Sequence, residues 1–182
     1  MKKQILLFPL LLIALVFTGC SDDDPDPVNE EEVITTMTVT LTPAGGGTAI
    51  TLKKTDLDGD GPNAPVYSVS GNLVAGTTYS GLIKVENETE TPAENITEEV
   101  IEEANEHQFF FTPAGGLDVT TTYADMDGDG NPLGVEFNLT ANTASMGTLT
   151  IVLRHEPTKP NTGLADAGGE TDVEATFNLT VE

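Results

Sequence analysis

The chain has 182 residues, and its thirty acidic and seven basic residues give a formal net charge of −23. That charge argues against nucleic acid and anionic membrane surfaces as partners, and favours cations, a basic protein partner or simple solubility. The lack of tryptophan and an aromatic content of 5% argue against a platform for stacking bases or sugars. The single cysteine excludes an internal disulfide, so stability must come from a hydrophobic core.

The N-terminus has the pattern of a targeting segment. A short basic start precedes an apolar run at residues 5–17, which is too short to cross a bilayer comfortably as a helix. Small residues then lead to the lone cysteine in Thr18-Gly19-Cys20. This pattern resembles the lipobox of bacterial lipoproteins, which implies a lipoprotein signal peptide at 1–19 and lipidation of Cys20. The alternative is an ordinary secretory signal followed by an incidental cysteine.

Residues 20–32 have the composition of an extended tether. Seven acids and two prolines leave almost nothing to bury, so we expect this segment to be disordered and self-repelling. Its start, Ser21 to Asp24, also resembles the acidic signal that sends some lipoproteins to the outer face of the outer membrane. That resemblance implies display at the cell surface, with a periplasm-facing position as the alternative.

Two motifs occur twice in the same order. Thr-Pro-Ala-Gly-Gly at 42–46 recurs at 112–116, an offset of 70 residues. The acidic motif at 56–61 recurs at 125–130, an offset of 69 residues. We interpret this as an internal duplication, with copies at about 33–112 and 106–182 that share the strand between them.

Apolar and polar residues alternate through most of the first copy. This period of two predicts strands near 37–41, 50–52, 67–73 and 79–85, separated by Gly- and Pro-rich turns.

Residues 86–106 depart from the strand pattern because they contain nine glutamates. Thr91 as N-cap, Pro92 in the first turn and an apolar face that includes Ile96 and Val100 predict one short helix over 91–105. Repulsion between glutamates four residues apart opposes this helix, and a solvated acidic loop is the alternative.

The second copy repeats the strand scheme. We expect strands near 108–112, 119–123, 135–139, 149–153 and 173–181, with a long loop before the last one. About nine strands, frequent turns and no βαβ alternation predict an all-β, antiparallel, immunoglobulin-like β-sandwich, built as a single domain over 33–182.

The whole chain also resembles a group of small lipoproteins that share the Asp-x-Asp-Gly-Asp-Gly and His-Gln-Phe-Phe patterns. Proteins of this group carry the family name "type 1 periplasmic binding fold". That name implies two doubly wound α/β lobes, whereas this chain lacks the alternation of strands and helices that such lobes require.

The second acidic loop has the spacing of an EF-hand calcium site. Its candidate ligands are Asp125, Asp127, Asp129, Asn131 through its carbonyl group, and Glu136. The first loop offers Asp56, Asp58 and Asp60 as weaker candidates, because Tyr67 stands where the closing glutamate would be. The alternative for both loops is a polar turn, since aspartate and glycine are the residues that tight turns use.

The remaining residues give no catalytic motif. His107 and His155 are the only histidines, and they are expected at strand ends as exposed or edge residues, with a transition-metal site as the alternative. We therefore predict a membrane-anchored surface lipoprotein that acts as a non-catalytic binding or structural module. The alternatives are a calcium-stabilised module, or an accessory part of an uptake or adhesion assembly whose segment 86–106 docks a basic partner.

Overall fold

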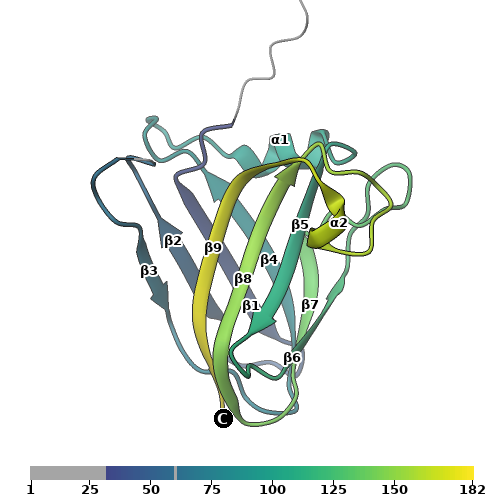
Figure 1. Cartoon of the computed structure of the whole chain (residues 1–182). Coiled ribbons are helices and arrows are strands. Elements are labelled where there is room, and N and C mark those ends of the chain that lie inside the picture. The colour runs from purple at the N-terminus through teal and green to yellow at the C-terminus, as the bar shows by residue number, and fades with distance from the viewer. Residues whose placement is uncertain (1–31, 60) are drawn as a thin grey trace, which may run out of the picture. The chain divides into compact units, whose positions relative to one another are not determined.

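The computed structural model describes residues 32–59 and 61–182, and the account below concerns these residues (Figure 1). The predicted signal peptide at 1–19, the lipidated Cys20, the tether up to residue 31 and the candidate ligand Asp60 lie outside the described residues. In the described part of the chain, neither helix has the length and apolar character needed to span a bilayer.

Nine antiparallel strands form two sheets that pack face to face, which confirms the predicted all-β sandwich (Figure 1). The larger sheet contains β1 (Thr36–Pro43), β2 (Ile50–Thr55), β3 (Val66–Val69), β4 (Thr78–Glu86), β6 (Val119–Tyr123) and β7 (Glu136–Ala141), in the order β3-β2-β1-β4-β7-β6. The smaller sheet contains β5 (His107–Ala114), β8 (Ser145–His155) and β9 (Glu170–Val181), in the order β5-β8-β9. The described residues therefore do not form the doubly wound α/β lobes that the family name implies.

The register of the strands agrees with an internal duplication. Pro43 of β1 lies opposite Tyr79 of β4, and Pro113 of β5 lies opposite Leu149 of β8. Both partners of the second pair follow those of the first by 70 residues, which is the offset of the repeated Thr-Pro-Ala-Gly-Gly motif. The hairpins β2–β3 and β6–β7 correspond in the same way.

The two copies differ in how their strands are divided between the sheets. In the first copy β1 pairs with β2, but in the second copy β5 and β6 belong to different sheets. The second copy therefore contributes to both layers, and its hairpin joins the first copy where β7 pairs with β4. This interlocking explains why the two copies fold as one sandwich rather than as two small ones.

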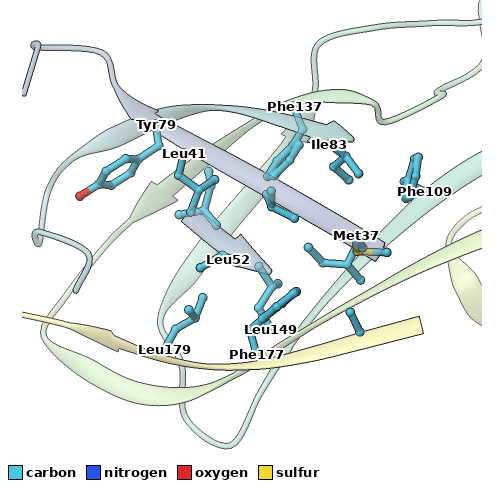
Figure 2. Packing of buried hydrophobic residues seen from close by; sticks show 14 of the residues in the cluster. Met37, Leu41, Leu52, Tyr79, Ile83, Phe109, Phe137, Leu149, Phe177 and Leu179 are labelled. Carbon is cyan, nitrogen blue, oxygen red and sulfur yellow. The ribbon is translucent and has the colours of Figure 1, made fainter. Parts of the chain in front are cut away.

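The core lies between the two sheets. Because side chains alternate along a strand, each strand turns one set of residues inward. Figure 2 shows Leu149 and Phe177 of the smaller sheet lying near Met37, Leu41 and Leu52 of the larger one, and all five are almost fully buried. Burial of side chains of this size stabilises the fold by about 1.5–3 kcal/mol each.

One cross-strand contact places an aromatic ring over a glycine. Gly81 of β4 lies opposite Phe137 of β7. A Cβ atom on Gly81 would lie only 2.4 Å from Cζ of the Phe137 ring, so the ring covers the bare backbone of the glycine. The centroid of the same ring lies 4.3 Å from that of Phe111 in the smaller sheet, so Phe137 links the two layers.

The acidic helix exists, but it is shorter than predicted and begins later. Helix α1 spans Ile96–Glu102, so Thr91 does not cap it, and its N-cap Asn95 makes no side-chain capping hydrogen bond. Tertiary contacts determine its position instead. Ile96 and Val100 are buried, and the hydroxyl group of Thr97 accepts a hydrogen bond from the backbone N–H of Val85 at 2.8 Å.

Two other predicted segments also differ. Strand β3 ends at Val69 rather than near residue 73, and all four of its residues are exposed because it forms an edge of the larger sheet. Leu73 is buried, and it meets β9 through a single bridge to Val181. The predicted long loop before β9 contains a short helix, α2 (Leu164–Ala167).

Candidate functional site

Both acidic loops, helix α1 and the two histidines lie at the end of the sandwich where β1 begins (Figure 1). The second acidic loop joins β6 to β7, and its first aspartate closes it. One oxygen of Asp125 accepts the N–H of Gly134 at 2.7 Å, and the other accepts the N–H of Glu136 at 2.8 Å. Both oxygens of this predicted calcium ligand are therefore used to hold the hairpin together.

Asp127 is the second predicted ligand, and it is buried. Its Oδ1 accepts the backbone N–H groups of Asp129 at 3.0 Å and Asn131 at 2.8 Å, and its Oδ2 lies 3.1 Å from Nζ of Lys159. Burial acts to raise the pKa of Asp127, but the N–H group of Asn131 and the ammonium group outweigh it and lower the pKa. A lowered pKa means that these contacts stabilise the fold at neutral pH and are lost as the pH falls through the folded-state value.

Lys159, from the loop between β8 and β9, supplies a positive charge to this region. Its side chain is 6% exposed. Besides Asp127, its ammonium group donates to the backbone carbonyl of Ala104 at 2.7 Å and to that of His107 at 2.6 Å. Two carbonyl oxygens and a carboxylate are the kind of ligands that a hard cation takes. The loop is therefore neutralised by a cation from the chain itself.

The other predicted ligands of the second loop are less enclosed. Asp129 accepts a hydrogen bond from the side chain of Asn105 at 3.3 Å, and Asn131 donates its side-chain N–H to Asp127. The side chain of Glu136 is exposed at the start of β7. Calcium at this loop would have to compete with these donors and with the Lys159 ammonium group, and the calcium hypothesis stays a prediction.

The first acidic loop, between β2 and β3, also contains turn-forming hydrogen bonds. Asp58 Oδ2 accepts the backbone N–H of Asn63 at 3.2 Å and its side-chain N–H at 2.7 Å. Asp56 lies 3.8 Å from Nζ of Lys54. Of the three candidates in this loop, Asp60 is outside the described residues.

The two histidines differ from the expectation that they are exposed or at an edge. They face each other across β5 and β8, and their rings stack with centroids 4.7 Å apart and an interplanar angle of 12°. His107 is fully buried and His155 is 6% exposed. Residues 37 and 85 pair across β1 and β4, so the 70-residue repeat could have predicted that residues 107 and 155 pair.

Carboxylates surround the stacked pair. Oε1 of Glu32 lies 3.2 Å from Nε2 of His107, and Oδ2 of Asp172 lies 3.9 Å from the same atom. Oε2 of Glu106 lies 4.0 Å from Nε2 of His155. Sequence reasoning missed these carboxylates, because they come from segments far apart in the chain and share no motif.

The electrostatics of this cluster are unusual for so acidic a protein. Burial acts to lower the pKa of His107, but the neighbouring Glu32 carboxylate, the carbonyl of Glu103 and Asp172 outweigh it and raise the pKa. Burial raises the pKa of Asp172 to about 6, and the charge of Glu32 adds to this effect. The cluster therefore holds more negative charge than its surroundings can stabilise well.

A hollow of about 780 Å³ lies at the opposite end of the sandwich, where β1 turns into β2 and β3 leads to β4. The described residues that line it carry no charged side chain. They are small, polar or apolar: Pro43, Gly46, Gly47, Thr48, Ala49, Ile50, Thr51, Ser70, Gly71, Asn72, Val74, Thr77 and Tyr79. Such a surface suits an uncharged group better than an ion.

Comparisons of the chain with models of protein families, with curated proteins and with solved structures found no match. The sequence patterns and the geometry of the two ends of the sandwich are therefore the evidence from which a function can be argued.

Proposed function

We propose that this chain is a lipid-anchored lipoprotein, displayed at the outer face of the outer membrane, whose β-sandwich is a non-catalytic binding or structural module. The observation that carries the proposal is the change in character at residue 32. Before it lie the lipobox-like Thr18-Gly19-Cys20 and an acidic tether, and from Thr36 onward the chain is a packed sandwich with its own core. This is the organisation expected of a domain presented at a distance from a membrane.

The use of the acidic side chains in loops supports a non-catalytic module. Asp125 closes the second acidic loop, Asp118 accepts hydrogen bonds from Asn142 and Thr143, and Asp166 accepts the N–H and hydroxyl groups of Thr162. A general acid or base needs a carboxyl group that is free to exchange a proton with a substrate. These three are instead acceptors that hold loops in place.

The anchor is tested directly by replacing the cysteine. In cells fed a radiolabelled fatty acid, we expect the wild-type chain to carry the label, to fractionate with outer membranes and to be removed by protease added to intact cells. Cys20→Ala should lose the label, because the thiol is the acceptor of the lipid. Cys20→Ser is the matched control for side-chain size and should lose the label as well. An unlabelled wild-type chain recovered in the soluble fraction would contradict the proposal.

A second candidate function is docking of a basic partner, and one observation favours it. In and just after α1, the glutamates at 98, 99, 102, 103 and 106 are exposed, and the last turn of α1 contains no basic residue. This is a one-sided acidic surface on an otherwise well-formed fold.

Cross-linking on intact cells tests this docking. A partner held by α1 should be captured at low salt and lost at high salt, because exposed charges are screened beyond roughly 10 Å at 0.1 M salt. Glu98→Gln together with Glu102→Gln should weaken the capture, whereas Glu174→Gln, on exposed β9, should not. Capture that persists at high salt and in the double variant would exclude α1 as the docking surface.

A further inference from the structure

We propose that His107, His155 and Asp172, with Glu32 as a fourth ligand, form a binding site for a divalent transition metal such as zinc. The site lies beneath the end of the sandwich where β1 begins, and it is separate from the predicted calcium loops. It brings together the start of β5, the end of β8, the start of β9 and the residue that precedes the first strand region.

The distances between the candidate ligand atoms are close to those around a bound metal. One ligand atom from each of His107, His155 and Asp172 lies within 4.8 Å of the others. Nε2 of His107 lies 3.2 Å from Glu32 and 3.9 Å from Asp172. Ligand atoms at about 2.0–2.2 Å from a tetrahedral zinc ion are roughly 3.3–3.6 Å apart, so small side-chain movements would complete the site.

The second nitrogen of His107 determines which way its lone pair points. Nδ1 lies 3.2 Å from the backbone carbonyl of Glu103, and a carbonyl oxygen can only accept a hydrogen bond. Nδ1 therefore carries the proton, and in the neutral ring Nε2 presents its lone pair toward the two carboxylates. A backbone carbonyl on the far nitrogen is the usual support of a metal-binding histidine.

Three buried atoms of the cluster have no hydrogen-bond partner. They are Nε2 of His107, Oδ2 of Asp172 and Oε2 of Glu32. The 3.2 Å contact between Glu32 and Nε2 is close but poorly aligned for a hydrogen bond. Leaving such groups buried and unpaired is costly, and a cation among them would satisfy the lone pair and the carboxylates together.

A small acidic hollow offers a route for a cation. It has a volume of about 80 Å³ and is lined by Glu32, Glu170, Thr171 and Asp172, so two of the proposed ligands form its wall. The strongly negative charge of the whole chain raises the local concentration of cations at such an opening. The site is therefore buried but adjacent to a surface that attracts metal ions.

The chemistry of the ligands favours a transition metal over calcium or magnesium. Calcium and magnesium prefer sites made wholly of oxygen atoms, whereas imidazole suits zinc, copper, nickel and cobalt. Two imidazoles and one or two carboxylates are a common set for zinc and for its spectroscopic substitute, Co²⁺.

Titration of the full-length protein, purified in detergent and stripped of metal, tests the proposal. We expect one Zn²⁺ to bind per chain in calorimetry, and Co²⁺ to give the visible absorption of a tetrahedral nitrogen and oxygen site that Zn²⁺ abolishes. Calcium in excess should displace neither metal. If Zn²⁺ does not bind, or if the Co²⁺ spectrum is that of the free aqueous ion, the cluster is a protonated histidine among carboxylates and the proposal fails.

Matched variants locate the metal. Asp172→Asn and His155→Gln should each weaken Zn²⁺ binding by at least tenfold and alter the Co²⁺ spectrum. Asp166→Asn, in the same loop before β9 but bonded to Thr162, should do neither. Circular dichroism of each apo variant shows whether it is folded. A folded Asp172→Asn variant that binds Zn²⁺ as the wild type does would overturn the assignment.

Discussion

Replacing Lys159 by methionine is expected to lower the free energy of unfolding by about 3 kcal/mol, because it removes the buried partner of an ionised carboxylate. The variant leaves Asp127 without its ammonium partner, and it also leaves the carbonyl groups of Ala104 and His107 without a donor. For a domain of this size, the loss corresponds to a fall of roughly 6–12 °C in the melting midpoint. Urea denaturation of the full-length protein, followed by circular dichroism, measures it.

A surface lysine provides the matched control for this variant. Lys84 pairs with Glu86, but its side chain is 50% exposed, so Lys84→Met should cost less than about 1 kcal/mol. Asp127→Asn should destabilise the fold in the same direction as Lys159→Met, and the double variant should cost less than the sum of the two. Equal effects of Lys159→Met and Lys84→Met would contradict the structural role of the buried pair.

The same variants decide the calcium hypothesis for the second acidic loop. At about 5 mM calcium, above the ~10⁻⁴–10⁻³ M range of weak extracellular sites, we expect the wild-type midpoint to stay where it is in EDTA. The Lys159 ammonium group already occupies the position beside Asp127. In Lys159→Met, calcium should recover part of the lost stability, because the oxygens then face no cation. A calcium-dependent rise in the wild type that Asp127→Asn abolishes would instead establish the loop as a calcium site.

The largest single loss of stability is expected from Phe137→Ala, at about 4 kcal/mol. Phe137 is fully buried between the sheets, so its removal leaves a cavity in addition to the lost burial of the ring. Gly81→Ala should cost roughly 1–3 kcal/mol by the opposite mechanism, because the new methyl group would lie within 2.4 Å of the Phe137 ring and force it aside. Both values are read from urea unfolding curves.

The double variant separates the contact between Gly81 and Phe137 from general damage to the sheet. Once Phe137 is alanine, a methyl group at residue 81 has space, so Gly81→Ala in that background should cost little or should even stabilise. Gly71→Ala is the control, because its Cβ would lie 3.9 Å from the nearest atom, on Ile50, and its backbone is unstrained. Strict additivity of Gly81→Ala and Phe137→Ala would show that the ring is not the reason for the glycine.

The strands were predictable because their signal is local. In β9, Ala175, Phe177 and Leu179 alternate with polar residues, and the same alternation is seen as buried and exposed positions. The start of α1 was not predictable in this way. Thr91 and Pro92 form a good local signal for a helix start, but the contacts of Ile96 and Thr97 with the end of β4 determine where the helix begins.

The candidate sites show the same division between local and distant information. The acidic loop from Asp125 is visible as a motif, but its neutralising Lys159 comes from the loop after β8 and belongs to no pattern. His107 and His155 also look unrelated in the sequence. Their pairing follows only when the repeat is used to transfer the register of β1 and β4 onto β5 and β8, and Asp172 has no counterpart that would announce it.

The position of β1 in the sheet determines how the domain would respond to mechanical load. β1 is the first strand after the tether, and it lies between β2 and β4 with antiparallel hydrogen bonds to both. A force applied through the tether would act along β1, so the hydrogen bonds on both sides would be loaded together in shear. A strand at the edge would be peeled away one bond at a time. Because forced unfolding is governed by the unfolding rate, a domain held at Cys20 under flow would stay folded longer than one tethered through β3.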